Sequence, residues 1–341
     1  MDFRFTDEQL MIAETARKLL AGTCSMAQLR AMLAEGAARD PTRWAGLIET
    51  GLTATLLPEP GGLGLAETDF ILVAEAAGYA ALPEPLVESS GIAAPLLAAI
   101  DPSHELISSE QTLAIGHTVN PFIADADTAA ALLLERDGAT YLLRPEQITL
   151  TRQESTDPFR RLFSVDWTPN TPISRDPRLW ADALDRGALF AAAQCAGLAQ
   201  RAIDIAVDYA KTREQFGKPI GAYQAVKHLI ANAQVKVEFA KPVIYAAAAA
   251  FPNRDAYSRA RISQAKLFAV EAADLAVRTS LQVHGAMGYS WEVDVHFLLK
   301  RALGLTNDWG GPAFHRARVM ERMLHGKMGP EHTFAREDEA G

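Results

Sequence analysis

The segment "TREQFGKPIGAYQ", residues 212–224, places polar side chains at fixed spacing beside a long alanine-rich stretch. Arg213 is followed by Gln215 and Phe216, and Gln224 stands eleven residues beyond Arg213 (224 − 213). An arginine guanidinium keeps its charge and offers a planar fork of donors, so one arginine can hold a phosphate group. The same side chain also suits the end of a helix, where a cation stabilises the helix dipole. In isolation, Arg213 leaves both interpretations open.

Charge and spacing argue against several other chemistries. The net charge of −9 does not suit a general binder of nucleic-acid backbones, which needs concentrated Lys and Arg. The segment "HGAMG" has too few glycines for a dinucleotide fingerprint and follows a helical pattern rather than a strand. Histidines also lack metal-binding spacing, and we predict no metal site. These histidines are His228, His284, His296 and His315.

The chain divides into three zones with different patterns of apolar and polar residues, and these zones must position the residues named above. Helical periodicity covers residues 1–110, short strand-like runs fill residues 111–176, and long helical patterns return over residues 177–330. The charged tail, residues 331–341, is expected to be flexible. We therefore predict a mostly α-helical protein with an N-terminal helical domain, a small middle β-domain and a C-terminal four-helix bundle.

Local signals place the individual elements. Thr6 and the acidic turn after it predict the start of the first helix, and a Pro- and Gly-rich loop predicts a new helix near Glu67. The run "AALLLERDGATYLLRPEQITL" predicts two strands joined at "RDG", and "RRLFSVDW" predicts a third. Four long helices are expected in the bundle, the third beginning at Asn253 as its cap. They cover residues 179–213, 223–251, 253–284 and 311–326.

The ends and the cysteines indicate a cytoplasmic protein. The N-terminal sequence "MDFRFTDEQL" is acidic and amphipathic, unlike a signal peptide. The longest apolar run, "VIYAAAAAF", is too short to span a bilayer. Cys24 and Cys195 match no metal spacing, and we expect both to be buried, reduced thiols.

With helical, β and helical zones in this order, the chain resembles the acyl-CoA dehydrogenase family. Four segments carry the resemblance: "MDFRFTDEQ", "WAGLIETGLTATLLPEPGGLGL", "GLAQRAIDIAVDYAKTREQFGKPIGAYQAVKHLIANA" and "LQVHGAMGYSWEVDV". The last matches a segment usually written Q-x-x-G-G-x-G. The resemblance implies FAD-dependent α,β-desaturation of an acyl-CoA thioester, with an electron-transfer acceptor as a further partner.

The resemblance also assigns FAD contacts. Arg213 would reach the FAD pyrophosphate, and Phe216 would pack on the flavin nucleotide. Gln224 stands at the family's spacing for a second polar contact. In the later motif the backbone approaches the adenosine half of FAD, and a methyl group at Ala286 replaces the motif's second glycine. The full set is Arg213, Gln215, Phe216, Gln224, Gln282, Gly285 and Ala286.

Family chemistry also requires a glutamate that removes the α-proton, and this chain has glycine at both usual positions. One is Gly310, after Trp309 in the turn "TNDWGGPAFHR", and the other is Gly187. Asp308 and Asp185 are the nearest carboxylates, but an Asp is one methylene shorter and points elsewhere, whereas proton transfer needs atoms within about 3 Å. Asp308 would otherwise be a solvated turn or cap residue. Asp185 would be a helix-start carboxylate or a contact to the pantetheine arm.

The middle zone lacks the family's flavin-ring motifs, and "HTVNPFIADAD" is their nearest remnant. In family dimers the middle domain and base serve FAD in cis, while the Arg213 and Gln282 motifs serve it in trans. The resemblance therefore implies a base-less subunit that completes the FAD site of a catalytic homologue, as in bacterial α2β2 enzymes of sterol side-chain degradation. Two alternatives stay open: a self-sufficient enzyme with an unusual base, and a structural subunit that binds no flavin.

Overall fold

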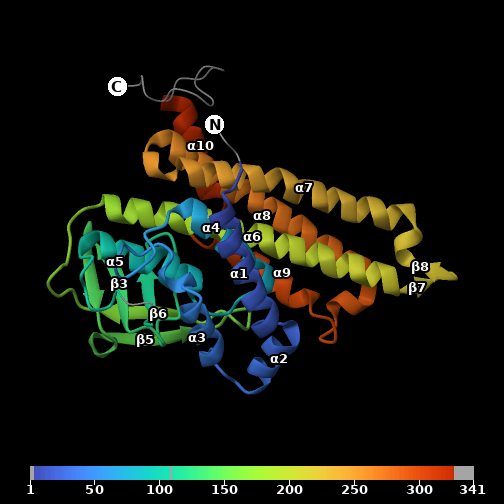
Figure 1. Ribbon diagram of the computed structural model, residues 1–341, viewed down its shortest axis with the longest axis horizontal. Coiled ribbons are helices and arrows are strands. Elements are labelled where there is room, and N and C mark those ends of the chain that lie inside the picture. Colours follow the sequence, from blue (N-terminus) through green and yellow to red (C-terminus); the bar gives the residue numbers. More distant parts are fainter. Residues whose placement is uncertain (1–3, 108–109, 326–341) are drawn as a thin grey trace.

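The computed structural model describes residues 4–107 and 110–325. Short helices and a small β-domain form one end of the molecule, and a bundle of long helices extends beyond them (Figure 1). This arrangement confirms the predicted fold class. The predicted flexible tail, residues 331–341, lies outside the described residues.

Two of the N-terminal helices begin where the sequence predicts. Thr6 accepts a hydrogen bond from the Gln9 amide, while the Gln9 side chain accepts from the Thr6 amide at 3.0 Å. This reciprocal pair satisfies two amides that have no partner inside the helix. The helix expected near Glu67 also begins at that residue. The helices are α1 (Asp7–Thr23), α2 (Met26–Ala34), α3 (Pro41–Glu49), α4 (Glu67–Ala80), the π-helix η2 (Leu86–Ala93) and α5 (Ala94–Ile100).

The middle β-domain contains two three-stranded sheets, in the orders β1-β3-β4 and β2-β6-β5. The predicted hairpin at "RDG" joins β3 to β4, and both turn residues, Asp137 and Gly138, have positive φ, as a two-residue hairpin turn requires. The third predicted strand is β6. The strands are β1 (Leu113–Gly116), β2 (Ile123–Ala124), β3 (Ala131–Arg136), β4 (Ala139–Leu143), β5 (Ile148–Gln153) and β6 (Leu162–Trp167).

Two strand predictions need correction. The run after the hairpin is not one strand, because a short turn at Pro145–Gln147 sends β4 and β5 into different sheets. The sequence patterns also missed β1 and β2. Strand β1 pairs in parallel with β3, and β2 is two residues long and pairs with the distant β6.

Up to residue 325, where the described part ends, the C-terminal region contains five α-helices: α6 (Arg178–Thr212), α7 (Gln224–Ala250), α8 (Ala256–His284), α9 (Val295–Asn307) and α10 (Pro312–His325). Helix α9 was not predicted. The third bundle helix does not begin at Asn253, which lies in a short 3-10 turn. Asp255 is its cap and accepts a hydrogen bond from the Ser258 amide at 2.7 Å. Arg254 has positive φ and interrupts the helical backbone between the two elements.

Glycines let α4 approach α6 closely. A Cβ at Gly78 would lie 2.1 Å from the Gln194 carbonyl oxygen, and a Cβ at Gly197 would lie 1.9 Å from that of Glu75. Only hydrogen fits at both positions. This contact joins the N-terminal helices to the alanine-rich part of α6, which is buried from Gly187 to Ala199.

Candidate functional site

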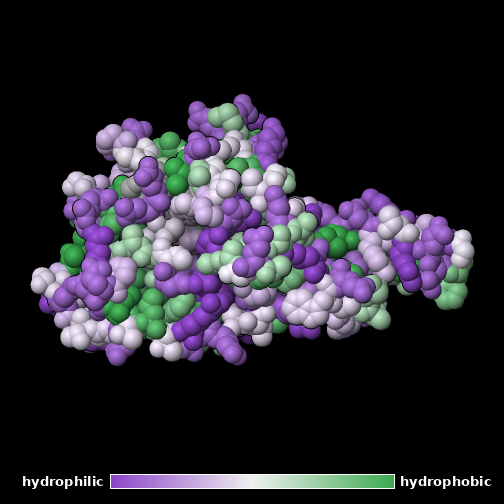
Figure 2. All heavy atoms as spheres, turned by 90° about the horizontal axis from the view of Figure 1, so that it is seen from below, coloured by the Kyte–Doolittle hydropathy of each residue, from purple (hydrophilic) through white to green (hydrophobic). Residues whose placement is uncertain are grey.

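The predicted FAD-binding segment forms an arm at the far end of the bundle. Arg213 caps the C-terminus of α6, and its amide donates to the Tyr209 carbonyl at 2.8 Å. The chain then forms a small hairpin, β7 (Glu214–Gln215) and β8 (Lys218–Pro219), before α7 begins. In the space-filling view this end of the molecule projects beyond the main body (Figure 2). The arm therefore lies away from the β-domain of its own chain.

Local contacts hold the arm in shape. Phe216 and Gly217 form the tip with positive φ, and the Phe216 side chain is 93% exposed. The Tyr223 hydroxyl donates to the Gln215 carbonyl at 3.0 Å, and the Ile220 amide donates to the Arg213 carbonyl at 2.8 Å. An ordered loop that presents a large apolar side chain to solvent is suited to contacting another molecule.

The second predicted motif lies at the same end of the bundle. His284, the last residue of α8, stacks on Tyr209 of α6 with ring centroids 4.1 Å apart. Tyr209 is four residues from Arg213 (213 − 209), so this stack brings the Q-x-x-G-G-x-G counterpart next to the base of the arm. All seven predicted cofactor residues are exposed: Arg213, Gln215, Phe216, Gln224, Gln282, Gly285 and Ala286.

The exposed groups fit an anionic nucleotide that approaches from outside the chain. Within the described ranges, Arg213 forms no ion pair, so its guanidinium is available for a phosphate. Gly285 has positive φ, and a Cβ built there would meet nothing within 4 Å, which leaves room for a ligand beside the backbone. Ala286 is also exposed, so its extra methyl faces open space.

The two glycines at the family's base positions come together at the opposite end of α6. A Cβ at Gly187 would lie 2.0 Å from Cδ2 of Trp309, so the indole ring occupies the space of any side chain there. Gly310 has a φ of +100°, and its Cβ would lie 2.5 Å from Cδ1 of Phe314. A glutamate fits neither position as the chain is folded.

Buried polar contacts fix the turn that carries Trp309. Its amide donates to the Asn120 side-chain oxygen at 2.8 Å, and His315 Nε2 lies 3.0 Å from its carbonyl oxygen. Lys266 Nζ donates to the Asp308 carbonyl at 2.9 Å. Burial, together with the charges of Lys266 and Arg318, lowers the pKa of His315 to about 4. His315 is therefore neutral at pH 7 and donates through Nε2.

The two weak candidate bases are engaged in ion pairs. The Asp308 carboxylate pairs with Arg160. Asp185 pairs with Arg318 at 2.6 Å and with Arg259 at 3.5 Å. Burial raises the pKa of Asp185, and these arginines oppose that effect. Asp308 is the C-terminal cap of α9, as expected of a cap residue, and its side chain is partly exposed. The expectation of a helix-start Asp185 is wrong, because Asp185 is buried eight residues into α6 (185 − 177).

Beside Trp309 lies a cavity of only about 60 Å³, lined by both apolar and charged side chains. Several of these form ion pairs across the N-terminal helices, the β-domain and α9, including Arg39 with Asp125 and Arg301 with Asp157. Its charged lining comprises Arg39, Glu84, Glu88, Asp125, Arg160, Arg161, Arg301 and Asp308. The small volume and charged walls do not suit a hydrocarbon acyl chain.

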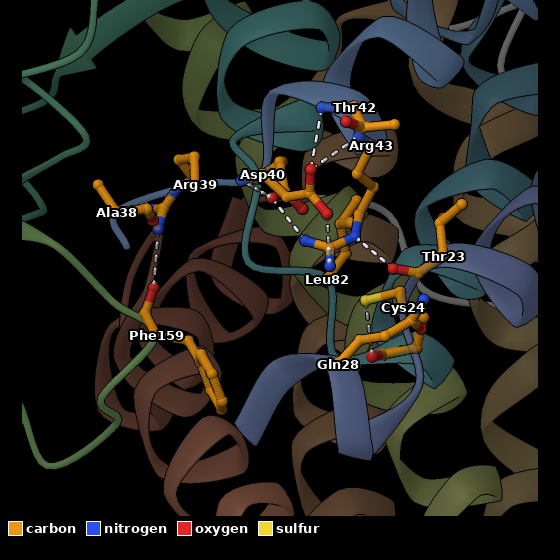
Figure 3. A network of polar contacts seen from close by, with 12 residues as sticks. Thr23, Cys24, Gln28, Ala38, Arg39, Asp40, Thr42, Arg43, Leu82 and Phe159 are labelled. Atoms are coloured by element: carbon orange, nitrogen blue, oxygen red, sulfur yellow. Dashed lines mark hydrogen bonds and ion pairs between the residues drawn. The ribbon is translucent and has the colours of Figure 1, made fainter. Parts of the chain in front are cut away.

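A second network of buried polar contacts adjoins this cavity. Figure 3 shows Arg43 reaching the Thr23 carbonyl, to which its Nε donates at 2.8 Å. The same guanidinium donates to Glu84 at 2.7 Å, and both side chains are 1% exposed. The Asp40 side chain accepts from the Arg43 amide at 3.3 Å. A buried and fully paired guanidinium of this kind ties α3 to the chain segments around it.

Sequence reasoning missed Glu88, which lies in the π-helix η2 and lines the small cavity. Burial raises the pKa of Glu88, and the nearby Asp308 adds to the effect. A carboxyl group in such surroundings holds its proton more tightly than an ordinary glutamate does. Its position in the apolar run "PLVESSGIAA" was an available signal, since a lone carboxylate rarely sits in such a run without a reason.

The arm and the closed cavity are too far apart to serve one cofactor. Gly187 and Arg213 are separated by 26 residues of α6 (213 − 187), which corresponds to about 39 Å along a helix. The flavin ring and the pyrophosphate of one FAD lie much closer together than this. One FAD could therefore not have its ring at this cavity and its pyrophosphate at Arg213 of the same chain.

Residues 4–107 and 110–325 show neither a metal-ligand cluster nor a membrane span. No group of three or more His, Cys, Asp or Glu side chains in these ranges is arranged to hold a metal ion. Among the helices that the structure describes, none combines the length and apolar character needed to cross a bilayer. Cys24 and Cys195 are both buried and free, as expected.

Known proteins with similar sequences include acyl-CoA dehydrogenases. Residues 178–324 match the family described as "Acyl-CoA dehydrogenase, C-terminal domain". The acyl-CoA dehydrogenase IpdE2 of Mycobacterium tuberculosis is 32% identical over 303 residues, which cover 87% of this chain and 92% of that protein. FadE34 of the same organism is 31% identical over 346 residues, and the match covers 92% of this chain but 48% of that protein.

Among solved structures, a chain of the ChsE4-ChsE5 complex from Mycobacterium tuberculosis has the same fold. The TM-score is 0.84 at 21% identity, with 96% of this chain and 100% of that chain covered. Fold, motif order and the extended match to IpdE2 lead to one conclusion. The chain belongs to the acyl-CoA dehydrogenase family.

Proposed function

We propose that this chain is the base-less subunit of an FAD-dependent acyl-CoA dehydrogenase and completes the FAD site of a partner chain. One observation carries the proposal: the exposed arm and the closed base site stand at opposite ends of α6, about 39 Å apart. The chain thus offers phosphate-binding groups outward and has no room for a glutamate inward. The activity belongs to the complex, and this chain alone is proposed to be inactive.

The chain's residues would act by binding and by shielding the cofactor. Arg213 would hold the pyrophosphate, because its guanidinium has no carboxylate partner in the described chain. Gln215 and Gln224 would add neutral hydrogen bonds, and Phe216 would cover the nucleotide from the hairpin tip. FAD held there would supply the acceptor for a hydride from the β-carbon of the acyl thioester. The partner chain would supply the glutamate that removes the α-proton.

The other predicted contact surface would approach the adenosine half. Gln282 would offer an amide, while Gly285 and Ala286 would leave space for the ribose or base because both face open solvent. All these contacts are distant from the reacting carbon atoms. They would therefore affect FAD retention more than the chemical step.

The relatives support a two-chain assembly. ChsE4-ChsE5 is named as a complex, and a chain of that complex shares the fold. In FadE34 the region similar to this chain covers 48% of the length, so about as much polypeptide again is joined to it. We propose a catalytic homologue as the partner, an α2β2 assembly, and the sterol-type acyl-CoA that the resemblance implies.

An arginine substitution in the co-purified complex tests the proposal. Arg213→Ala should lower the affinity for FAD by about tenfold or more, the effect expected for one charge-assisted contact. Lys211→Ala is the matched control, since it removes an exposed positive charge two residues away (213 − 211). Flavin absorbance per complex should fall only in the arginine variant. Unchanged flavin in Arg213→Ala would instead favour a structural subunit that binds no nucleotide.

Glu88 is the candidate base for the alternative, in which the chain is a self-sufficient enzyme. Its side chain is partly buried beside the small cavity and its pKa is raised, whereas both Asp308 and Asp185 form ion pairs. If this alternative holds, the purified chain alone is yellow and desaturates acyl-CoA, and Glu88→Gln abolishes that activity. Our proposal predicts no activity of the chain alone, with or without the substitution.

A further inference from the structure

A second cavity, of about 520 Å³, lies between α1, α4, α6 and α7 and takes no part in the proposed FAD contacts. Its volume is in the range of sites for small ligands. It shares no lining residue with the small cavity beside Trp309. Arg201 in its wall precedes Arg213 by twelve residues of α6 (213 − 201), about 18 Å, so the cavity is also separate from the arm.

The inner wall of this cavity is apolar. Leu20 and Met26 from the N-terminal helices are buried there, as is Ala76 from α4. Alanine also stands at two further wall positions, Ala21 and Ala80. Small side chains on facing helices leave the space open, and such a surface favours a hydrocarbon group over water.

The charged part of the wall has an excess of cations. Lys241 pairs with Glu75 at 3.2 Å, and Glu75 also accepts a hydrogen bond from the Tyr245 hydroxyl at 2.6 Å, so this carboxylate is already used. Arg17 and Arg201 form no ion pair with any residue that the structure describes. The Arg201 guanidinium lies 5.3 Å from the centroid of the Tyr79 ring.

Two guanidinium groups without an ion-pair partner among the described residues therefore stand beside an apolar wall. They would attract an anion, and their planar forks match a carboxylate in particular. The apolar wall would take the remainder of the same molecule. We propose that this cavity binds a small amphipathic carboxylate, with its charged end between Arg17 and Arg201 and its apolar body against Ala76 and Ala80.

Titration calorimetry on the full chain, alone or in its complex, tests the site with sodium decanoate as the probe. We expect one binding event per chain. Arg17→Gln and Arg201→Gln should each weaken it by about tenfold, the loss expected for one charge-assisted contact. Arg278→Gln is the matched control and should leave binding unchanged, because Arg278 is exposed on α8 and lines no part of this cavity.

Two further measurements separate a built site from general adsorption. Ala21→Phe should block decanoate, and because Ala21 is exposed, the variant should fold normally. Decyltrimethylammonium, which has the same tail and the opposite charge, should not bind. The proposal is overturned if decanoate does not bind, if it binds the arginine and Ala21 variants as well as the parent chain, or if the cation binds equally. None of these outcomes depends on FAD, so the proposed function stands or fails separately.

Discussion

Trp309 fills the space that a side chain at position 187 would need, so a glutamate at that position would not fit the packing. The sequence shows the two glycines, but it does not reveal the indole ring that covers one of them. Position 187 is in α6 and Trp309 follows α9, and no local pattern reveals that segments 122 residues apart (309 − 187) meet. The same non-local packing hid Glu88, whose neighbour Asp308 comes from the other end of the chain.

Adding a methyl group at Gly187 should therefore destabilise the chain. Gly187→Ala places a Cβ 2.0 Å from Trp309 Cδ2, and overpacking of this kind costs about 1–3 kcal/mol of the free energy of unfolding. Gly22→Ala in α1 is the control, because a Cβ there meets nothing within 4 Å and should stabilise by up to about 1 kcal/mol. Urea unfolding of both variants measures the difference. Equal stability of the two would show that the indole does not fill this space.

His315 should make the chain less stable as the pH falls below neutral. Its folded pKa is about 4, below the ordinary value of 6.5. Below pH 6.5 the unfolded chain therefore binds a proton that the folded chain refuses until about pH 4, and stability is lost across that window. At pH 4.5 the loss should reach about 2 kcal/mol.

His315→Asn isolates this effect from other titrating groups. The variant should be less stable at pH 7, since it loses contacts to Trp309 and Ser263. Its stability should nevertheless change less between pH 7 and pH 4.5 than that of the parent. Parallel pH dependences in urea unfolding would contradict a neutral, buried His315.

At the scale of elements, the sequence predicted what local patterns determine. Capping at Thr6, the helix at Glu67 and the "RDG" hairpin were correct because each depends on a few neighbouring residues. The parallel pairing of β1 with β3 depends on a contact across the domain, and β2 is too short for a periodic signal. At the third bundle helix, Asp255 and the positive φ of Arg254 outweighed the expected cap at Asn253.

The exposed tip of the arm at the α6–α7 connection should contribute little to folding stability. Phe216 is 93% exposed, so Phe216→Ala should change the free energy of unfolding by less than about 0.5 kcal/mol. In the complex it should still speed the loss of FAD, which fluorescence of released flavin measures on dilution. Phe268→Ala, at an exposed position on α8, is the control. If both variants release flavin at the parental rate, Phe216 does not cover the nucleotide.

At the scale of the whole molecule, the bundle separates the proposed FAD-contacting arm from the two positions at which the resemblance places a base. Arg213 and its neighbours are exposed at one end, and Trp309 and a network of ion pairs lie toward the other. The small sheets lie beside the end that holds Trp309 (Figure 1). We propose that a chain built this way completes the FAD site of a partner chain and has no complete FAD site of its own.

Flavin stoichiometry tests this claim most directly. The chain should be purified alone and together with a co-expressed catalytic homologue, and FAD should be quantified per polypeptide by absorbance after denaturation. The account predicts little flavin and no dehydrogenase activity for the chain alone, and one FAD per pair of unlike chains in an active complex. One FAD per chain in an active preparation of this polypeptide alone would contradict it.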